Sequence, residues 1–297
     1  MVRAHVILNS RAGRLIDGDV HRTMRTIEGR LKQAGWSVSA ACPAPGELEA
    51  HLRGLDPTLD VVVAAGGDGT LAGVGACLAG RRTALAVLPL GTLNVLADDL
   101  GVPVALDEAL DVAVSGRTAA VDAATVNGRV FFIQAVLGVA AELAERREKM
   151  RGAGSVAAWA ELATGMATDL LASTPVRYQV NTGRRRTTII TRTLIISNNR
   201  LKNRHRLLPY RRTLSGQVMA LYALRGKGLI TAMRFAAEAL LPRGKSAAVR
   251  ELVADRIVVN ADIKEGRALI DGEIASIDFP ATFETVPRAL NVIVPQR

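Results

Sequence analysis

The sequence predicts an α/β N-terminal domain with a parallel sheet, followed by a mainly β C-terminal domain with a few helices. In the first part of the chain, short apolar runs alternate with segments of helical periodicity, which is the pattern of βαβ units. Strand-like segments dominate the remainder. At 297 residues and 49% hydrophobic content, the chain can bury two cores. We place the boundary near residues 121–127 and expect domains at 1–125 and 126–297.

The first domain is expected to begin with a strand and to alternate between strands and helices from there. The spacing of its apolar residues separates the two kinds of element. The predicted strands are at residues 4–8, 37–40, 61–65 and 84–88, and the predicted helices are at 20–35, 47–55, 70–78 and 102–116.

A glycine-dense loop follows a strand of three valines and two alanines, a composition that indicates burial on both faces of a sheet. Gly66, Gly67 and Gly69 lack a Cβ, so an anion can approach the backbone N–H groups. Thr70 lies near the N-terminus of the next helix. Because the Asp68 carboxylate repels a bare phosphate, a nucleotide with Mg²⁺ fits this loop better than phosphate alone.

Two other nucleotide motifs fit the loop less well, and an unliganded turn remains an alternative. Residues 67–72 match the dinucleotide-binding fingerprint, but no acidic residue follows about 20 positions later to hold a ribose. A Walker A loop requires a lysine before serine or threonine, and the sequence contains no such motif. A tight strand-to-helix turn without a ligand would use the same glycines.

A second loop of similar chemistry follows the next buried strand. Its sequence, P-L-G-T-L-N, places Thr92 and Asn94 at the end of that strand. The ordered pair of G-G-D-G-T and P-L-G-T-x-N, about 20 residues apart, resembles the catalytic domain of the diacylglycerol kinase family. That superfamily includes sphingosine kinases and soluble bacterial lipid kinases, which this chain resembles best, and NAD kinases as more distant relatives.

The resemblance implies an NAD kinase/diacylglycerol kinase-like fold that binds ATP and Mg²⁺ at the two glycine loops. It also marks Asn9 as a phosphate or ribose contact, because the family has N-P-x-S-G at the place of residues 9–13. A simple Asx turn would explain Asn9 equally well. The chain departs from the family pattern at Cys42, Ala72, Gly73, Val95, Gln134 and Ser215.

The second domain is predicted to be a β-rich, lipid-binding domain. A strand at 129–138 resembles the family segment that opens this domain. Further strands are predicted at 176–180, 187–197, 217–224, 256–261, 268–270 and 288–294, and helices at 141–149, 155–171 and 228–241. The apolar helix at 155–171 contains acidic residues, so we expect it to pack on protein or line a groove. The strand at 288–294 is free to return to either domain.

The motif Asp271-Gly272-Glu273 follows a predicted strand. In isolation, an Asp-Gly pair favours an ordinary hairpin turn. Found with the two glycine loops, the motif resembles the family's D-G-E turn. The resemblance implies that Asp271 is the general base toward a lipid hydroxyl and that Glu273 orients metal or nucleotide. Asp68 would then lie near the catalytic Mg²⁺, directly or through water.

Residues 214–218, L-S-G-Q-V, lie where many relatives have D-G-x-L, whose Asp helps to hold a structural Mg²⁺. Ser215 stands in place of that Asp. Since a neutral hydroxyl binds Mg²⁺ poorly, we predict that this auxiliary metal site is absent.

Basic residues are concentrated in one segment of the chain. The net charge is +10, and residues 177–212 contain eleven basic residues and no acidic one. Such a segment suits an anionic membrane surface, at roughly 1 kcal/mol per basic residue, a nucleic acid or a solvated face. With 3% aromatic residues and no nucleic-acid motif, we expect peripheral contact with an anionic membrane and no nucleic acid. An ordinary charged face remains an alternative.

The cysteine content and the apolar runs bear on location. Cys42 and Cys77 offer neither a disulfide framework nor metal-ligand spacing. The chain opens on a strand-like segment rather than a signal sequence, and no run approaches the ~18 uncharged apolar residues of a membrane span. We therefore expect a cytoplasmic protein that associates peripherally with membranes, and we leave a homodimer open.

Together the motifs predict an ATP-dependent lipid kinase that transfers the γ-phosphoryl group to a diacylglycerol-like hydroxyl. Two alternatives stay open. NAD kinase activity shares the G-G-D-G motif but fits P-L-G-T-L-N and the D-G-E turn less well. A degenerate, non-catalytic nucleotide- or lipid-binding protein is favoured by the six departures from the family pattern.

Overall fold

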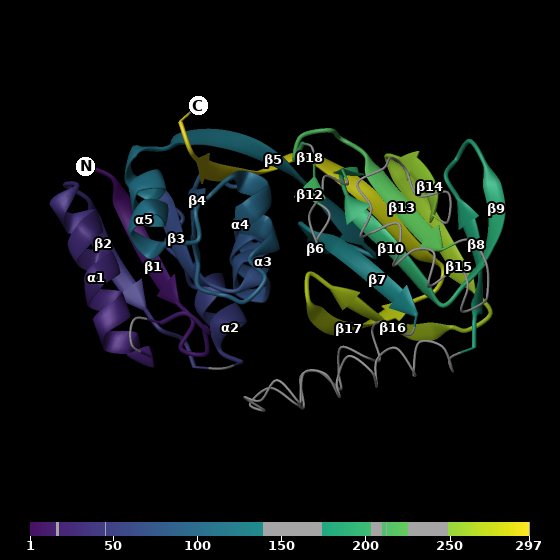
Figure 1. Cartoon of the computed structure of the whole chain (residues 1–297), viewed down its shortest axis with the longest axis horizontal. Helices are drawn as coiled ribbons and strands as arrows, with labels where there is room; N and C mark the ends of the chain where they lie inside the picture. The colour runs from purple at the N-terminus through teal and green to yellow at the C-terminus, as the bar shows by residue number, and fades with distance from the viewer. Residues whose placement is uncertain are drawn as a thin grey trace, which may run out of the picture. The chain divides into compact units, whose positions relative to one another are not determined.

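The structure, a computed structural model, describes residues 1–15, 18–44, 46–138, 174–202, 210–211, 213–224 and 249–296 (Figure 1). The chain divides into two compact units. The first consists of Met1–Ala123, Thr213–Gly216 and Val286–Arg297, and the second of Ala124–Arg212 and Gln217–Thr285. The helices expected at 141–149, 155–171 and 228–241 lie outside the described residues.

The sheet of the first unit has the strand order β2-β1-β3-β4, and the C-terminal part of β18 follows β4. All of these neighbours pair in parallel. β3 and β4 are buried along their whole length, as expected for central strands with helices on both faces. The bounds are β1 Arg3–Leu8, β2 Ser37–Ala41, β3 Val61–Gly66, β4 Ala84–Pro89 and β18 Ala281–Val294.

Five described helices cover this sheet. α1 packs with α5 on one face, and α3 packs with α2 and α4 on the other (Figure 1). The sequence sets the start of α1: the Asp19 carboxylate caps the first turn by accepting hydrogen bonds from His21 N and Arg22 N, at 2.7 and 3.1 Å. The bounds are α1 Val20–Gln33, α2 Leu48–Arg53, α3 Asp68–Leu78, α4 Val95–Leu100 and α5 Leu106–Ser115.

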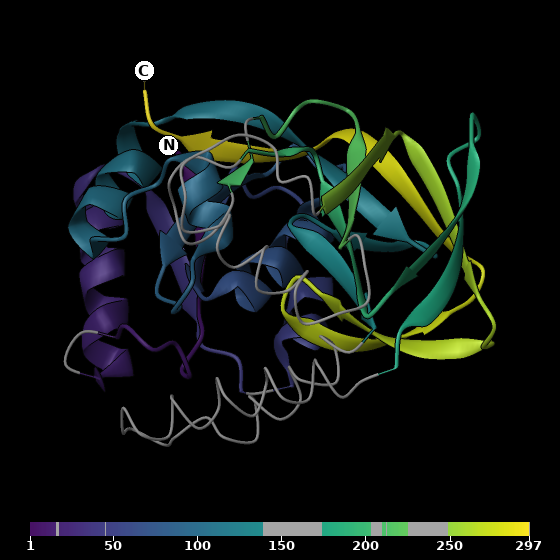
Figure 2. The same cartoon turned by 45° about the vertical axis from the view of Figure 1, so that its right-hand side comes forward.

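The second unit is built from antiparallel strands. One sheet has the order β14-β13-β10-β7-β16-β17, and β9, β8 and β15 form another with the N-terminal part of β18 (Figure 2). β5, Arg117–Val126, begins in the first unit and pairs with β18 and β6. The other bounds are β6 Arg129–Phe131, β7 Gln134–Gly138, β8 Val176–Asn181, β9 Arg186–Thr191, β10 Thr193–Asn198, β11 Leu201–Lys202, β12 Tyr210–Arg211, β13 Met219–Leu224, β14 Val249–Ala254, β15 Arg256–Ala261, β16 Glu265–Ile270 and β17 Glu273–Asp278.

An apolar cluster of described residues holds strands of the second unit together. At its centre Phe131 and Phe283 meet edge to face, with ring centroids 6.4 Å apart and an angle of 84° between the rings. Both rings are fully buried. Edge-to-face contact is a favoured geometry for aromatic pairs, because the positive edge of one ring meets the negative face of the other.

These sheets confirm the predicted fold class, an α/β N-terminal domain with a mainly β C-terminal domain. Some element boundaries differ from the prediction. α4 was not expected; its first turn is held by a hydrogen bond from Leu96 N to Asp68, a residue distant in sequence. The strand expected at 129–138 is divided into β6 and β7, and the one expected at 187–197 into β9 and β10. β14 and β17 are additional strands.

In the part of the chain that the structure describes, no helix combines the length and the apolar character needed to cross a bilayer.

Replacing Phe283 by alanine should lower the free energy of unfolding by about 3–5 kcal/mol, because the truncation leaves a cavity beside Phe131. Urea denaturation followed by circular dichroism measures the change. Ile263→Ala is the control: that side chain is 53% exposed, so its loss should change stability by about 0.5 kcal/mol or less. Equal losses for both variants would contradict the assignment of Phe283 to the core.

Candidate functional site

Three loops meet at the C-terminal ends of β1, β3 and β4. Backbone hydrogen bonds join them: Asn9 N donates to Ala65 O at 2.9 Å, Leu90 N to Gly66 O at 3.0 Å, and Arg14 N to Leu90 O at 3.1 Å. In an open parallel sheet, ligands bind at the carboxyl ends of the strands. The loops therefore lie where the fold places a ligand site.

The two glycine loops approach each other too closely for a side chain at Gly91. A Cβ on Gly91 would lie 2.5 Å from the Cα of Gly67 and 2.9 Å from Asn94 Oδ1. A Cβ on Gly66 would lie 2.8 Å from the Cβ of Thr70. Glycine is required at both points by steric contact. Gly91 was not among the predicted binding residues, although it is the glycine of P-L-G-T-L-N.

The N-terminus of α3 begins within the first loop, with Gly67 as its N-cap residue. The first bond of the helix runs from Leu71 N to Gly67 O, at 3.0 Å. The N–H groups of the first turn have no intrahelical partner, and Gly67 has no side chain to cap them. Exposed N–H groups at the positive end of a helix dipole bind anions, and phosphate above all.

The Asn9 side chain ties the loop after β1 to this turn. Its Nδ2 donates to Thr70 Oγ1 at 2.7 Å, and its Oδ1 accepts from Arg11 N at 2.9 Å, which is an Asx turn. Thr70 is buried, whereas the Thr92 side chain is exposed. A nucleotide contact through Asn9, Thr70 or Thr92 stays a prediction.

Asp68 has a structural partner within the first unit. Its Oδ1 accepts a hydrogen bond from Leu96 N at 3.0 Å, in the first turn of α4. Asp68 is therefore the first residue of α3, and its carboxylate holds the first turn of α4. The described residues contain no group of three His, Cys, Asp or Glu side chains that would hold a metal ion. A single carboxylate fits Mg²⁺ that arrives with a nucleotide, because that ion retains water and phosphate ligands.

Asn94 shapes the second loop from inside. Its backbone is left-handed, with φ of 51°, and its side chain is buried. Oδ1 accepts from Gly91 N and Nδ2 donates to Gly91 O, both at 2.9 Å. The side chain is thus engaged with the loop itself, and a direct contact to a nucleotide stays a prediction.

In the second unit, Asp271 lies at the turn between β16 and β17 with φ of 48° and 6% exposure. Its carboxylate accepts three backbone hydrogen bonds: Oδ2 from Phe132 N at 2.6 Å, and Oδ1 from Ile133 N at 2.8 Å and Gln134 N at 2.9 Å. These bonds explain why the strand expected at 129–138 is interrupted: its N–H groups turn to a carboxylate instead of a neighbouring strand.

The carbonyl side of the same segment is also bonded. Asn198 Nδ2 donates to Phe132 O at 3.0 Å, and Arg211 Nη1 donates to the same oxygen. Both side chains are buried. The sequence offers one signal for Asn198, an asparagine pair after a predicted strand, but none for Arg211, which looked like one more cation of the basic segment.

Burial raises the pKa of the Asp271 carboxyl above its ordinary value. The N–H groups of residues 132–134 and the charge of Arg211 act against this rise, because they stabilise the ionised form. Asp271 is therefore a buried acid whose ionised form is stabilised mainly by backbone N–H groups and to a smaller extent by Arg211.

Glu273 is the accessible acid of this turn. Its side chain is exposed, and its Oε2 lies 3.3 Å from Arg129 Nη2. Exposed ion pairs contribute about 0–1 kcal/mol, so this contact holds the carboxylate only weakly.

The Ser215 hydroxyl lies 3.3 Å from Thr213 Oγ1 in the first unit, and the absence of the auxiliary Mg²⁺ site stays a prediction.

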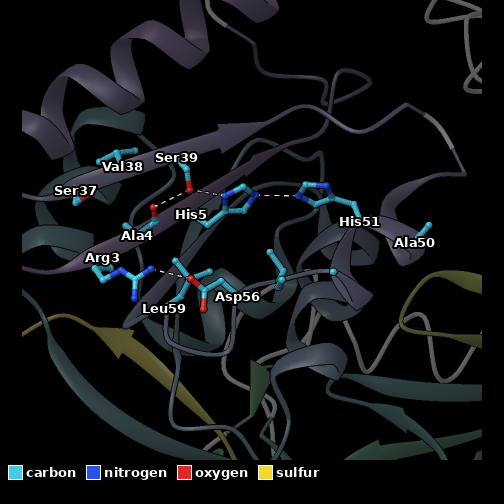
Figure 3. A pocket seen from close by; sticks show the side chains of 12 residues that line it. Arg3, Ala4, His5, Ser37, Val38, Ser39, Ala50, His51, Asp56 and Leu59 are labelled. Atoms are coloured by element: carbon cyan, nitrogen blue, oxygen red, sulfur yellow. Dashed lines mark hydrogen bonds and ion pairs between the residues drawn. The ribbon is translucent and has the colours of Figure 1, made fainter.

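A hollow of about 550 Å³ lies elsewhere in the first unit, beside the first half of β1 (Figure 3). His5 Nδ1 lies 2.7 Å from Ser39 Oγ, and His5 Nε2 lies 2.9 Å from His51 Nε2. Burial, with a smaller effect from His51, lowers the pKa of His5. None of the predicted site residues is among the described residues that line this hollow. Asn9, the predicted site residue next to β1, follows the opposite end of that strand.

Known proteins resemble this chain in sequence and in fold. Residues 3–126 match the family described as the diacylglycerol kinase catalytic domain. A probable lipid kinase YegS-like protein of Citrobacter koseri is 44% identical over 84 residues, which cover 27% of this chain and 28% of that protein. A diacylglycerol kinase of Staphylococcus saprophyticus is 34% identical over 133 residues, or 43% of each protein. The matches thus span less than half the length of these relatives.

The fold is shared along nearly the whole chain. The crystal structure of a putative diacylglycerol kinase from Bacillus anthracis str. Sterne superposes with a TM-score of 0.76 at 18% identity, covering 98% of this chain and 96% of that one. A diacylglycerol kinase structure from the same organism gives 0.73 at 18% identity over 98% and 96%. These findings confirm the resemblance found in the sequence: residues 3–126 match the diacylglycerol kinase catalytic-domain family.

Proposed function

We propose that the chain is an ATP-dependent lipid kinase that transfers the γ-phosphoryl group to the hydroxyl of a diacylglycerol-like lipid. The observation that carries this proposal is the contact of the two glycine loops at Gly67 and Gly91, beside the uncapped N-terminus of α3. Together they offer backbone N–H groups to an extended anion, as a triphosphate requires. The catalytic-domain match at residues 3–126 supports the same class of reaction.

In this reaction the protein contributes mainly position and charge. The N–H groups of the first loop hold phosphate oxygens, and Asn9 keeps Thr70 in place beside them. Asp271 accepts the proton of the lipid hydroxyl, and Glu273 orients metal or nucleotide. Asp68 would hold Mg²⁺ that arrives with ATP, directly or through water, and the ion would supply neutralisation of the phosphate charge.

The proposed acceptor also defines partners and location. A lipid hydroxyl is presented at a membrane surface, so the proposed enzyme works from the cytoplasm as a peripheral protein of an anionic leaflet. We include no nucleic acid among its partners. A homodimer stays a prediction.

A non-catalytic nucleotide- or lipid-binding protein is the second candidate. The observation that favours it is that Asp271 is buried and already accepts three backbone hydrogen bonds. A general base must reach the proton that it removes. If Asp271 only holds the segment at 132–134, the chain would bind its ligands without turnover.

Radiolabelled ATP, supplied with diacylglycerol, phosphatidylglycerol, sphingoid bases or NAD, separates these functions. A labelled lipid supports the proposed kinase and identifies its acceptor. Transfer of the label to NAD would show NAD kinase activity and would contradict the proposed lipid kinase. ATP binding without any labelled product would favour the non-catalytic candidate.

The first prediction for the site concerns Gly91. A methyl group at this position collides with Gly67, so Gly91→Ala should displace the loops and lower kcat/KM for ATP by about 10²-fold, the cost of a ~1 Å misplacement. Gly73→Ala is the control, because its Cβ would meet only Leu48 Cδ2, at 3.7 Å. Steady-state kinetics with ATP varied decides the matter. Normal kinetics for Gly91→Ala would contradict the role of the loop contact.

The second prediction concerns Asp271. Asp271→Asn should lower the rate of lipid phosphorylation by about 10²–10⁴-fold while ATP still binds. Because the amide turns a donor toward backbone N–H groups, stability should also fall by about 1–3 kcal/mol, so turnover is measured well below the melting temperature. Asp278→Asn, at an exposed acid of the same hairpin, is the control. Unchanged turnover of Asp271→Asn would rule out this base.

The third prediction concerns pH. The base acts when it is ionised, and burial raises the pKa of Asp271, so the rate should fall with decreasing pH at a higher pH than for an exposed aspartate. Arg211 lowers that pKa, so Arg211→Gln should move the acidic limb of the rate profile to still higher pH. Arg211→Lys, which keeps the charge, should move it less. Superimposable profiles for the three proteins would exclude Asp271 as the titrating base.

A further inference from the structure

The structure separates the cations of the basic segment into groups with different surroundings. Arg211 is buried against backbone carbonyls, and Arg200 pairs with Glu251. Residues 203–209 and 212 lie outside the described part. By contrast, Arg184 and Arg185 in the turn between β8 and β9, and Arg186 at the start of β9, are exposed, and no carboxylate of the described residues pairs with them.

The turn that carries these arginines is well ordered by its own hydrogen bonds. Thr182 N donates to Arg185 O at 3.0 Å, and Gly183 N donates to Asn181 Oδ1 at 2.9 Å. Gly183 has φ of +75°, which a side chain would disfavour. A turn fixed in this way presents its arginines at little cost in backbone entropy when they bind.

A second strand brings another cation to the same place. Arg250 of β14 donates from Nη2 to Thr187 Oγ1 of β9 at 2.7 Å. Arg185 and Arg250 then line one hollow of about 340 Å³, together with Glu251 and Leu252. Arg250 lies outside residues 177–212, so the concentration of charge in the sequence did not point to it.

Glu251, the one acid among the described residues that line this hollow, is already paired with a cation. Arg200 Nε and Nη2 donate to Glu251 Oε1 and Oε2 at 3.0 and 2.9 Å, a bidentate pair. Tyr222 OH donates to Oε1 at 3.3 Å. The charges of Arg185 and Arg250 therefore remain uncompensated within the described lining. Two guanidinium groups at one hollow match the oxygens of a phosphate, which they can bind in bidentate fashion.

We propose that Arg185 and Arg250 form a binding site for the phosphate of an anionic membrane lipid, and that the β8–β9 turn is where the second unit contacts the bilayer. Only one part of this proposal rests on the proposed lipid-kinase function: that the phosphate belongs to a membrane lipid. A nucleic acid is disfavoured, because the described lining residues include no aromatic side chain on which a base would stack.

Cosedimentation with vesicles tests the proposal without ATP or turnover, so its result is independent of whether the chain is a kinase. The whole chain is mixed with vesicles of phosphatidylcholine, alone or containing phosphatidylglycerol. We expect binding to the anionic vesicles only. Raising the salt from about 0.1 M to about 1 M, which shortens the Debye length from about 10 Å to about 3 Å, should abolish it.

The double variant Arg185→Gln/Arg250→Gln should bind anionic vesicles about 30-fold more weakly, at roughly 1 kcal/mol per cation. Arg81→Gln/Arg82→Gln removes the same charge from the first unit and should leave binding unchanged. Arg184→Gln/Arg185→Gln alters only exposed turn residues, so its weaker binding cannot be ascribed to misfolding. The Lys pair Arg185→Lys/Arg250→Lys retains charge and should retain most of the binding.

Three results would overturn the proposal. The first is equal binding to neutral and anionic vesicles, and the second is an equal loss in the Arg81/Arg82 and Arg185/Arg250 variants. The third is binding of single-stranded RNA, or of inorganic phosphate by calorimetry, that depends on Arg185 while anionic vesicles are not bound.

Discussion

The contact between the backbones at Gly67 and Gly91 constrains the first unit more than any other described feature. It requires β3 and β4 to end side by side, and both strands are buried along their whole length. Strands buried on both faces need helices on each side, which fixes the βαβ order of the unit. Since Gly91 cannot carry a side chain at this contact, backbone approaches backbone there, and backbone N–H groups suit phosphate.

In the second unit, the segment at residues 132–134 is held by hydrogen bonds to buried polar and charged side chains. Asp271 bonds the N–H side of residues 132–134, while Asn198 and Arg211 bond the carbonyl side. Buried polar groups are costly when unpaired, so such a cluster is stable only when its members are all engaged. The two acids of the turn between β16 and β17 differ in their surroundings. Asp271 is buried and hydrogen-bonded, whereas Glu273 is exposed to solvent.

Local patterns were sufficient to predict the buried strands, most helices of the first unit and the two glycine loops. They fail where a partner distant in sequence decides the structure. The break between β6 and β7 depends on a carboxylate more than a hundred positions later, and α4 depends on the bond from Leu96 N to Asp68. The turn role of Asn94 and the burial of Arg211 have the same origin. For an isolated cation, composition does not distinguish a membrane contact from a buried hydrogen-bond donor.

The path of β18 has a consequence for how the protein is made. This strand pairs with β15 through its first residues and with β4 through Asn291 and Val292. A nascent chain that has left the ribosome only as far as residue 123 therefore has β4 without its outer neighbour, and an open edge can pair with other chains. The sheet of the first unit is therefore complete only after the intervening β-rich unit has been translated.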